Sequence, residues 1–344
     1  MASVAHLLEI TNTVAVETDQ KIDRIHGITR RSRMLALNAS IEAQRVGQMG
    51  RGFAVVADEV KAISAEISQL TDSLRGDLKG KLATLSEFGR SLATDFERVR
   101  GERLADLAHN AVEIADRNLY ERSCDVRWWA TDPAMVDCAA HTDDSAKARH
   151  AGKRLGVILD SYTVYLDLWI ADAQGRVIAS GRPNRYNAVG TDVSGEQWFK
   201  DAMASRNGGE FAVADITRNR SLDNAVVATY ATAIRENGEA DGAPIGALGI
   251  FFDWQAQGRS IVEGVRLSPE EKTKSRCLII DSNHRIIADS AGHGTLTEHF
   301  PLDTRGGERG WYMDNFGTLV GYALTPGYET YAGLGWYGIL LQEE

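Results

Sequence analysis

The chain has 344 residues, a formal net charge of -10 and an apolar share of 43%. This length allows two or three domains with cores of their own, and the acidic balance argues against a nucleic-acid partner because no basic face emerges to neutralise phosphates. The longest apolar runs, such as Ile245 to Trp254, stop far short of the roughly 20 residues that span a bilayer, and the first residues lack the pattern of a secretory signal. We therefore expect no membrane span and a cytoplasmic location.

The first 75 or so residues predict two helical arms that fold back on each other. Apolar and small residues recur at heptad spacing in the first arm, at Val4, Leu8, Thr11, Ala15, Thr18, Ile22, Ile25 and Thr29. The second arm carries a cleaner repeat, at Val56, Val60, Ile63, Ile67, Leu70 and Leu74. This spacing is typical of a coiled-coil seam. Since one hairpin cannot bury both edges of such a seam, we expect a homodimeric four-helix bundle, and the alternative is a hairpin docked on its own chain.

The turn between the arms is predicted near residues 46–52, where Gly47, Gly50 and Gly52 follow one another closely. Glycine takes the positive φ angles that a chain reversal requires, and it disfavours the interior of a helix. Beyond Leu74 the apolar stripe continues past four further glycines, which mark either helix breaks or tolerated weak points: Gly76, Gly80, Gly89 and Gly101. The long helix is expected to reach Ala130, where Asp132 and Pro133 begin a new helix.

The sequence pattern changes beyond residue 160, where runs rich in β-branched and aromatic residues predict strands. The first series comprises residues 165–170, 177–180, 210–215, 225–234 and 246–253, with a short helix at 195–205; the second comprises 277–281, 285–289, 319–325 and 335–342. The turn that begins at Asp281 parallels the turn that begins at Asp172. This pattern predicts two similar α+β modules in tandem.

The stretch from Met34 to Val60, MLALNASIEAQRVGQMGRGFAVVADEV, resembles the signalling tip of methyl-accepting chemotaxis proteins. The resemblance implies partners, namely a chemotaxis histidine kinase and a coupling adaptor protein, and an association of dimers into trimers. It also implies that one set of residues forms the partner and trimer contact: Met34, Leu37, Asn38, Ile41, Glu42 and Arg45. Considered one residue at a time, these positions have an alternative explanation. Leu37 and Ile41 could be residues of the coiled-coil seam, and Glu42 and Arg45 could form a local ion pair.

This sequence departs from the family pattern in two ways. Arg30-Arg31-Ser32-Arg33 stands where relatives usually carry an aromatic residue followed by Gln-Thr-Asn, so like charges would meet near a threefold axis. Neither arm has an adjacent pair of Glu or Gln residues of the kind that is methylated in the family. We therefore expect no methylation and leave open whether trimers form.

Residues 97–344 resemble a double Cache sensor domain, which has a long leading helix and two PAS-like modules. The predicted fold class is thus an α-helical coiled-coil hairpin plus α+β, with tandem PAS-like modules behind a long leading helix. The signalling hairpin is predicted at 1–96, the leading helix at 97–130, the first module at about 160–262 and the second at about 263–344. The chain ends after the last predicted strand, which also favours a cytoplasmic receptor.

The resemblance implies a ligand site in the first module, formed by Trp198, Phe199, Asp215 and Asp253. In amino-acid-binding relatives an arginine stands where this chain has Glu196, and a tyrosine where it has Val213. Acidic and aromatic side chains without that cation favour a cationic amine over an amino acid, unless Arg182 or Arg185 supplies the missing charge. The alternative is that the aromatic residues only pack and that Asp253 caps an element.

Scattered histidines, and the lack of a Walker loop, GxSxG or HExxH motif, argue against an enzyme, a cofactor and a metal site. The cysteines Cys124, Cys138 and Cys277 follow no ligand spacing and are expected to be reduced thiols. The predicted function is that of a cytoplasmic chemoreceptor that senses a small molecule and controls a chemotaxis kinase. The alternative is a ligand-sensing scaffold that acts on a partner outside chemotaxis.

Overall fold

The computed structural model describes residues 2–343, with side chains from residue 6. The chain divides into two compact units, Met1–Arg100 and Gly101–Glu344. We call them the hairpin unit and the C-terminal unit. Sequence patterns placed this division between residues 96 and 97, close to where it lies.

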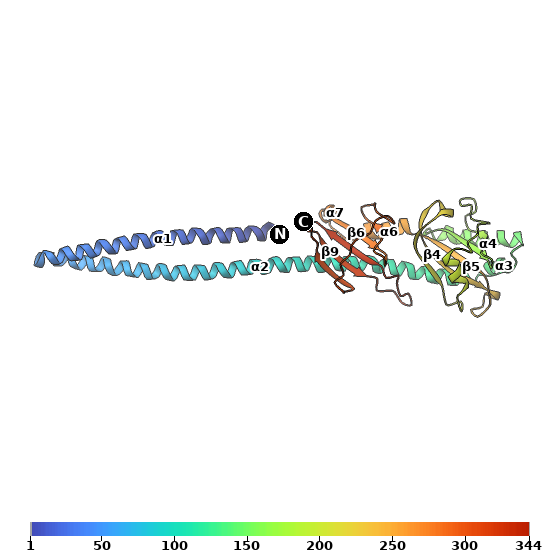
Figure 1. Cartoon of the computed structure of the whole chain (residues 1–344), viewed down its shortest axis with the longest axis horizontal. Helices are drawn as coiled ribbons and strands as arrows, with labels where there is room; N and C mark the ends of the chain where they lie inside the picture. The colour runs from blue at the N-terminus through green and yellow to red at the C-terminus, as the bar shows by residue number, and fades with distance from the viewer. Residues whose placement is uncertain (1, 344) are drawn as a thin grey trace. The chain divides into compact units, whose positions relative to one another are not determined.

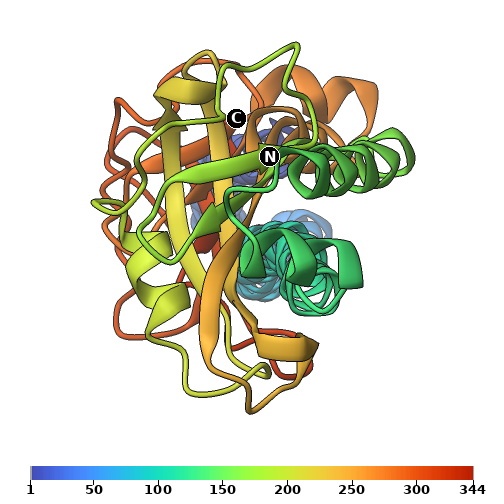
Figure 2. The ribbon, with the colours of Figure 1, turned by 90° about the vertical axis from the view of Figure 1, so that its right-hand side faces the viewer.

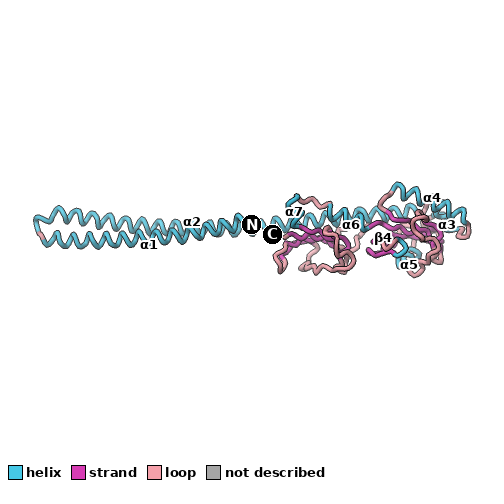
Figure 3. The backbone as a smooth tube through the Cα atoms, turned by 90° about the horizontal axis from the view of Figure 1, so that it is seen from above, coloured by secondary structure: helices cyan, strands magenta, loops and turns pink. Residues whose placement is uncertain are grey.

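The hairpin unit consists of two antiparallel helices, as predicted (Figures 1 and 3). Helix α1 spans Ala2–Arg45, the short 3-10 helix η1 spans Gly47–Gly50, and α2 begins at Arg51. Helix α2 continues to Trp129 without a break, so the four glycines beyond Leu74 are tolerated within a helix. Its last residue lies next to the predicted end at Ala130.

The tight turn requires glycine at two of the three predicted positions. Gly47 has φ +67°, a conformation that side chains with a Cβ rarely adopt. Gly50 has an ordinary φ, but a Cβ at this position would overlap the carbonyl of Ala43. Gly52 was assigned to the turn incorrectly, because it lies in the first turn of α2 with open space around it.

The two arms touch each other through small side chains. In α1 the predicted seam is buried or half-buried from Leu8 to Thr29, apart from Ile25, while Val4 lies outside the residues whose side chains are described. In α2 the residues facing α1 are instead Ala57, Ser64 and Thr71. Helix α1 does not bury the predicted second-arm seam, whose six members are 39% to 71% exposed: Val56, Val60, Ile63, Ile67, Leu70 and Leu74. We call these six residues the α2 stripe.

The C-terminal unit contains two five-stranded antiparallel sheets with the same topology. The first has the order β2-β1-β5-β4-β3, and the second has the order β7-β6-β10-β9-β8. The strands of the first sheet are β1 Tyr165–Asp172, β2 Val177–Ser180, β3 Ala212–Asn219, β4 Ala225–Arg235 and β5 Pro244–Asp253. Those of the second are β6 Ser275–Ile280, β7 Ile286–Asp289, β8 Arg309–Met313, β9 Leu319–Leu324 and β10 Tyr337–Gln342. The prediction of two similar modules is therefore confirmed, although β8 was missed.

Short helices complete the first module and connect it to the second. They are α3 Pro133–Ala140, α4 Ser145–Ser161, α5 Gln197–Met203, α6 Trp254–Glu263 and α7 Pro269–Lys274, with the 3-10 helices η2 Arg220–Leu222 and η3 Glu236–Gly238. Asp132 caps α3 through its bond to the Ala134 amide, and Pro133 follows it, as predicted. Figure 2 shows α2, α3 and α4 on one face of the first sheet, and α5 packs on the other face.

Both modules use an aspartate to form their first hairpin turn. The Oδ1 of Asp172 accepts hydrogen bonds from the amides of Gln174 and Arg176, at 3.0 and 2.8 Å. The Oδ1 of Asp281 accepts from the amides of Asn283 and Arg285, both at 2.9 Å. This match confirms that the two turns are equivalent.

A loop covers one edge of each sheet in the same way, at β2 in the first sheet and at β7 in the second. Beside β2, the Val177 amide donates to Thr191 and the Gly190 amide donates to Val177. Beside β7, the Ile286 amide donates to Glu298 and the Leu296 amide donates to Ile286. The edge strands β2 and β7 therefore have hydrogen-bond partners on both sides at these positions.

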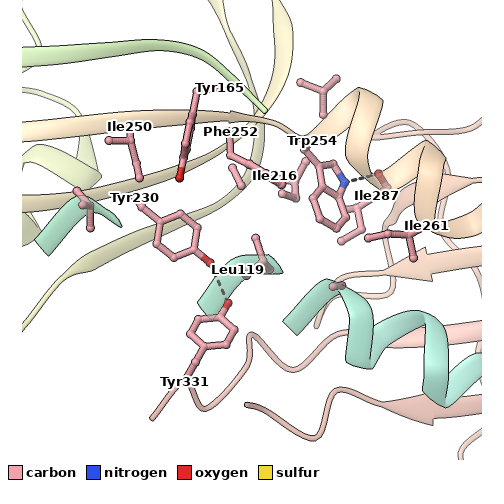
Figure 4. Close-up of a cluster of buried hydrophobic side chains, with 14 of the residues drawn as sticks. Leu119, Tyr165, Ile216, Tyr230, Ile250, Phe252, Trp254, Ile261, Ile287 and Tyr331 are labelled. Carbon is pink, nitrogen blue, oxygen red and sulfur yellow. Dashed lines mark hydrogen bonds between the residues drawn. The ribbon is translucent and has the colours of Figure 1, made fainter. Parts of the chain in front are cut away.

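One apolar core built on α2 joins the two modules. It includes Leu119 of α2, Tyr230 of β4 and Trp254 of α6 (Figure 4). Trp336, which precedes β10, belongs to the same core. In the second module, Gly321 and Gly338 let the backbone of α2 lie directly on the sheet, since a Cβ at either would overlap α2. Movements of α2 therefore act directly on the sheets.

Candidate functional site

The predicted partner-contact residues lie on an exposed face of α1 near the turn. Met34, Leu37 and Ile41 are 58%, 44% and 57% exposed, and Asn38 is exposed beside them. Glu42 and Arg45 form an ion pair at 3.7 Å, with both side chains mostly in solvent. We call these six residues the tip face. Large apolar side chains held in solvent are typical of a surface that meets another protein.

The basic departure lies on the same helix. Arg30, Arg31 and Arg33 are exposed, whereas Ser32 is half-buried. Three neighbouring guanidinium groups make this part of α1 strongly positive. An acidic partner would be favoured there, and a second copy of the same surface would be repelled.

In the first module, α5 packs two of the predicted ligand residues onto the sheet. Trp198 and Phe199 are 4% and 6% exposed, and their ring centroids lie 6.0 Å apart. Trp198 also meets Phe251 of β5 edge to face, at 5.9 Å. A Cβ on Gly249 would lie 3.0 Å from the Trp198 ring. The indole ring therefore packs directly against the backbone of Gly249. The structure thus brings the two aromatic residues together in an apolar core.

Asp215 lies in the first module but interacts with the second. A register shift in β3 between Ala214 and Thr217 places Asp215 at an irregularity of the strand. Burial raises the pKa of its carboxyl group, and nearby Asp281 raises the pKa further, while the Ile216 amide and Arg285 lower it. The charges nearest to Asp215 therefore come from the second module, and not from the surroundings of Trp198.

The remaining candidates have structural contacts of their own. Asp253 caps α6 by accepting a hydrogen bond from the Ala256 amide at 3.2 Å. The Arg182 guanidinium donates to the carbonyls of Leu159, Tyr165 and Leu166, so it ties the chain together around β1. Arg185 lies over the Tyr186 ring at 5.0 Å and is exposed. Of the two arginines, only Arg185 keeps its guanidinium on the surface.

Sequence reasoning missed two buried carboxyl groups on α2. Asp125 accepts a hydrogen bond from the Tyr165 hydroxyl at 2.5 Å and pairs with Arg122 at 3.2 Å. Asp116, nine residues earlier in the same helix, is fully buried. The signal was present in the sequence, because Asp116 falls between Val112 and Leu119 on the apolar stripe of the helix.

Comparison with known proteins identifies the class of the hairpin unit. Residues 1–99 match the family model described as the methyl-accepting chemotaxis protein (MCP) signalling domain. The methyl-accepting chemotaxis protein PctB of Pseudomonas aeruginosa is 35% identical over 126 residues, which cover 34% of this chain and 20% of PctB. The chain thus spans about a fifth of the length of this relative. Its first 99 residues are therefore similar to an MCP signalling domain.

Comparison with solved structures identifies the fold of the C-terminal unit. The ligand-binding domain of the P. aeruginosa amino-acid chemoreceptor PctC, solved in complex with GABA, superposes with a TM-score of 0.51 at 16% identity. The superposition covers 70% of this chain and 99% of the PctC domain. The leading helix, the two antiparallel sheets and this likeness establish a Cache-type, PAS-like sensor fold, as predicted.

The predicted cytoplasmic location is contradicted by a second structural likeness. The extracellular domain of rpHK1S-Z16 superposes with a TM-score of 0.52 at 13% identity, covering 71% of this chain and 94% of that domain. The fold is thus one that serves outside the cell in such proteins, so the cytoplasmic assignment is wrong. None of the helices described between residues 2 and 343 combines the length and the apolar composition that a membrane crossing requires.

Proposed function

We propose that this protein is a chemoreceptor-type transducer that binds a small molecule in its C-terminal unit and controls a chemotaxis histidine kinase through its tip face. The observation that carries the proposal is the continuity of α2, Arg51–Trp129, which belongs to both units. A signalling domain and a sensor fold that share one helix can exchange mechanical signals without a separate connector.

The active form is proposed to be a homodimer whose α2 stripes are buried against the partner copy. Six large apolar residues in register along one helix would otherwise remain in water, which disfavours the isolated hairpin. Packing two hairpins into a four-helix bundle removes them from solvent. The same arrangement displays one tip face per copy.

The ligand is proposed to be an amine or an amino acid, bound in the first module beside Trp198 and Phe199. The PctC domain, which shares the fold, was solved with GABA, a molecule with both an ammonium and a carboxylate group. Here the arginine position of amino-acid-binding relatives holds the exposed Glu196, which favours a cationic amine. Asp215 or Asp253 would have to leave its present contacts to meet the ligand.

Calorimetry on the full chain with polyamines, simple amines and amino acids tests the ligand class. We expect heat of binding with an amine, and its loss in Trp198→Ala. Binding of an amino acid without any amine would contradict the preference for a cation.

A reconstituted kinase assay tests the signalling role. Leu37→Ala removes an apolar side chain from the tip face, whereas Val14→Ala removes one that is equally exposed, at 44%, but lies about six turns earlier in the same helix. We expect Leu37→Ala to lower kinase control and binding of the coupling adaptor, and Val14→Ala to leave both unchanged. Equal effects of the two substitutions would argue against the tip face.

A second function is favoured by the exposed arginines. Arg30, Arg31 and Arg33 oppose the close approach of further copies and attract acidic surfaces. The chain would then be a ligand-sensing scaffold for a partner outside chemotaxis. Pull-down with chemotaxis kinase and adaptor separates the two functions, because only the transducer retains them.

A further inference from the structure

Two buried oxygen atoms at the junction of α2 and the second module lack hydrogen-bond partners among the described residues. Asp116 of α2 is 0% exposed; its Oδ2 accepts from the Gly327 amide at 2.7 Å, whereas its Oδ1 has no partner. The Oγ1 of Thr325, a residue that is 7% exposed, has none either. Buried oxygens without partners are costly, so such atoms usually face a bound molecule.

Both oxygens face the same point beside Gly333. A Cβ built on Gly333 would lie 3.1 Å from the Thr325 Oγ1 and 3.5 Å from the Asp116 Oδ1. Gly333 has φ +77° and no side chain, so it places no side-chain atom beside the two oxygens. Thr325, Gly327 and Gly333 all belong to the connection between β9 and β10, residues 325–336, which we call the β9–β10 loop.

Two tyrosines lie close to this carboxylate. The Tyr230 hydroxyl donates to the Tyr331 hydroxyl at 3.1 Å, beside Leu119 of α2 (Figure 4). Burial raises the pKa of both hydroxyl groups, and the charge of Asp116 raises it further. The aromatic rings exclude water and suit a cation.

The carboxylate of Asp116 has no cation to balance it. The neighbouring Arg117 pairs with Glu113 at 2.7 Å and lies over the Tyr328 ring at 5.0 Å. Burial raises the pKa of Asp116 to about 6, and only the Gly327 amide opposes this shift. Across residues 6–343, no cluster of three or more His, Cys, Asp or Glu side chains could hold a metal ion. The free Oδ1 of Asp116 is therefore an acceptor that suits a donor, and the Thr325 hydroxyl can accept from the same donor.

We propose that Asp116 and Thr325 form a second ligand site, which binds ammonium or a short protonated primary amine. Such a cation has only donors, so it satisfies both free oxygens and neutralises the carboxylate. The site is distinct from the one beside Trp198, because Tyr230 and Trp198 belong to cores on opposite faces of the first sheet. A ligand here would fasten the β9–β10 loop to α2.

Thermal unfolding of the full chain with added salts tests this site. At about pH 8, where Asp116 is ionised, we expect ammonium and methylammonium chloride to raise the melting temperature in a saturable way. Sodium chloride and tetramethylammonium chloride at equal ionic strength should not, since neither cation donates a hydrogen bond. Equal shifts with all four salts would overturn the proposal.

Substitutions test whether Asp116 and Thr325 are responsible for the rise in melting temperature with ammonium. Asp116→Asn should abolish the ammonium shift, and the matched control Asp160→Asn, at an exposed position of α4, should retain it. Thr325→Val removes an unpaired hydroxyl, so it should fold at least as well as the parent chain while binding ammonium more weakly. An undiminished shift in Asp116→Asn or in Thr325→Val would refute the site.

Proton competition gives an independent readout if Asp116→Asn folds poorly. Titration of 15N-labelled ammonium by NMR should show an affinity about tenfold weaker one pH unit below the pKa of Asp116 than well above it. An affinity independent of pH would contradict the assignment. These measurements involve no kinase and no first-module ligand, so their failure leaves the proposed function standing.

Discussion

The two units differ in the exposure of their large apolar side chains. In the C-terminal unit, the bulky side chains of Trp169, Trp254 and Trp336 are at most 1% exposed. In the hairpin unit, contacts between the helices are made by small residues, while Phe53 and Leu70 are 77% and 71% exposed. The C-terminal unit is therefore stabilised by its own core, whereas the hairpin unit leaves many of its large apolar side chains in solvent.

The largest change in the free energy of unfolding is expected from a substitution of Trp254. Its ring meets Trp336 at 5.0 Å, and its Nε1 donates to the Ile287 carbonyl at 2.8 Å. Trp254→Ala leaves a cavity and an unpaired carbonyl, so we expect it to lower the free energy of unfolding by about 3–5 kcal/mol. Trp128→Ala, at a site that is 68% exposed, should change it by less than about 0.5 kcal/mol in the same denaturant titration.

A smaller effect is expected from pH, through Asp116. Its pKa rises from 3.8 to about 6 on folding, so the native state holds this proton more tightly than the unfolded chain. Its contribution is fully present below about pH 4 and is lost as the pH rises through about 6, a change of about 3 kcal/mol. The difference between the parent chain and Asp116→Asn should follow this course. If the difference in stability between the two proteins does not change with pH, the carboxyl of Asp116 is not buried as described.

The hairpin unit should respond through association rather than through its own unfolding. Val60 belongs to the α2 stripe, whereas Val55 is 70% exposed outside it. Val60→Ala should weaken self-association by about 1 kcal/mol per copy, since it removes apolar area from the interface. Sedimentation equilibrium measures this, with Val55→Ala as the control. If both variants associate like the parent chain, the comparison between the units fails.

The smallest effect concerns Gly76 and Gly80 of α2. A Cβ at either position would meet no atom within 4 Å, so alanine fits there without strain. Each substitution should stabilise the helix by about 0.5–1 kcal/mol, which hydrogen exchange of the nearby amides would detect. Ligand affinity should stay unchanged while the response of the kinase changes. A large loss of affinity would contradict the independence of the two units.

Much of the fold could be predicted because local patterns agreed with it. The helical arms, nine of the ten strands and the repeated aspartate turns all had a sequence signal of their own. Strand β8, Arg309–Met313, was missed because its alternation is short and its glycine resembles a turn. The surface that covers the α2 stripe could not be predicted, because heptad spacing does not reveal which partner a seam faces.

The candidate ligand site was harder to predict because it depends on side-chain direction. Trp198 and Phe199 belong to the predicted short helix, and their rings lie in the apolar core between that helix and the sheet. The direction of Asp215 depends on the register shift in β3, which no local pattern in the sequence marks. Asp116 was overlooked, although a charged residue on an apolar helical stripe is a signal that sequence alone can supply.

The loops beside β2 and β7 have a consequence for how copies of the chain meet. An open strand edge is a template on which a neighbouring molecule can add its own strand, and this is a route to aggregation and amyloid. Here the edge amides at Val177 and Ile286 are already occupied by the chain's own loops. Strand addition by a neighbouring copy is therefore blocked at these positions of β2 and β7, and the edges that remain for such pairing are those of β3 and β8.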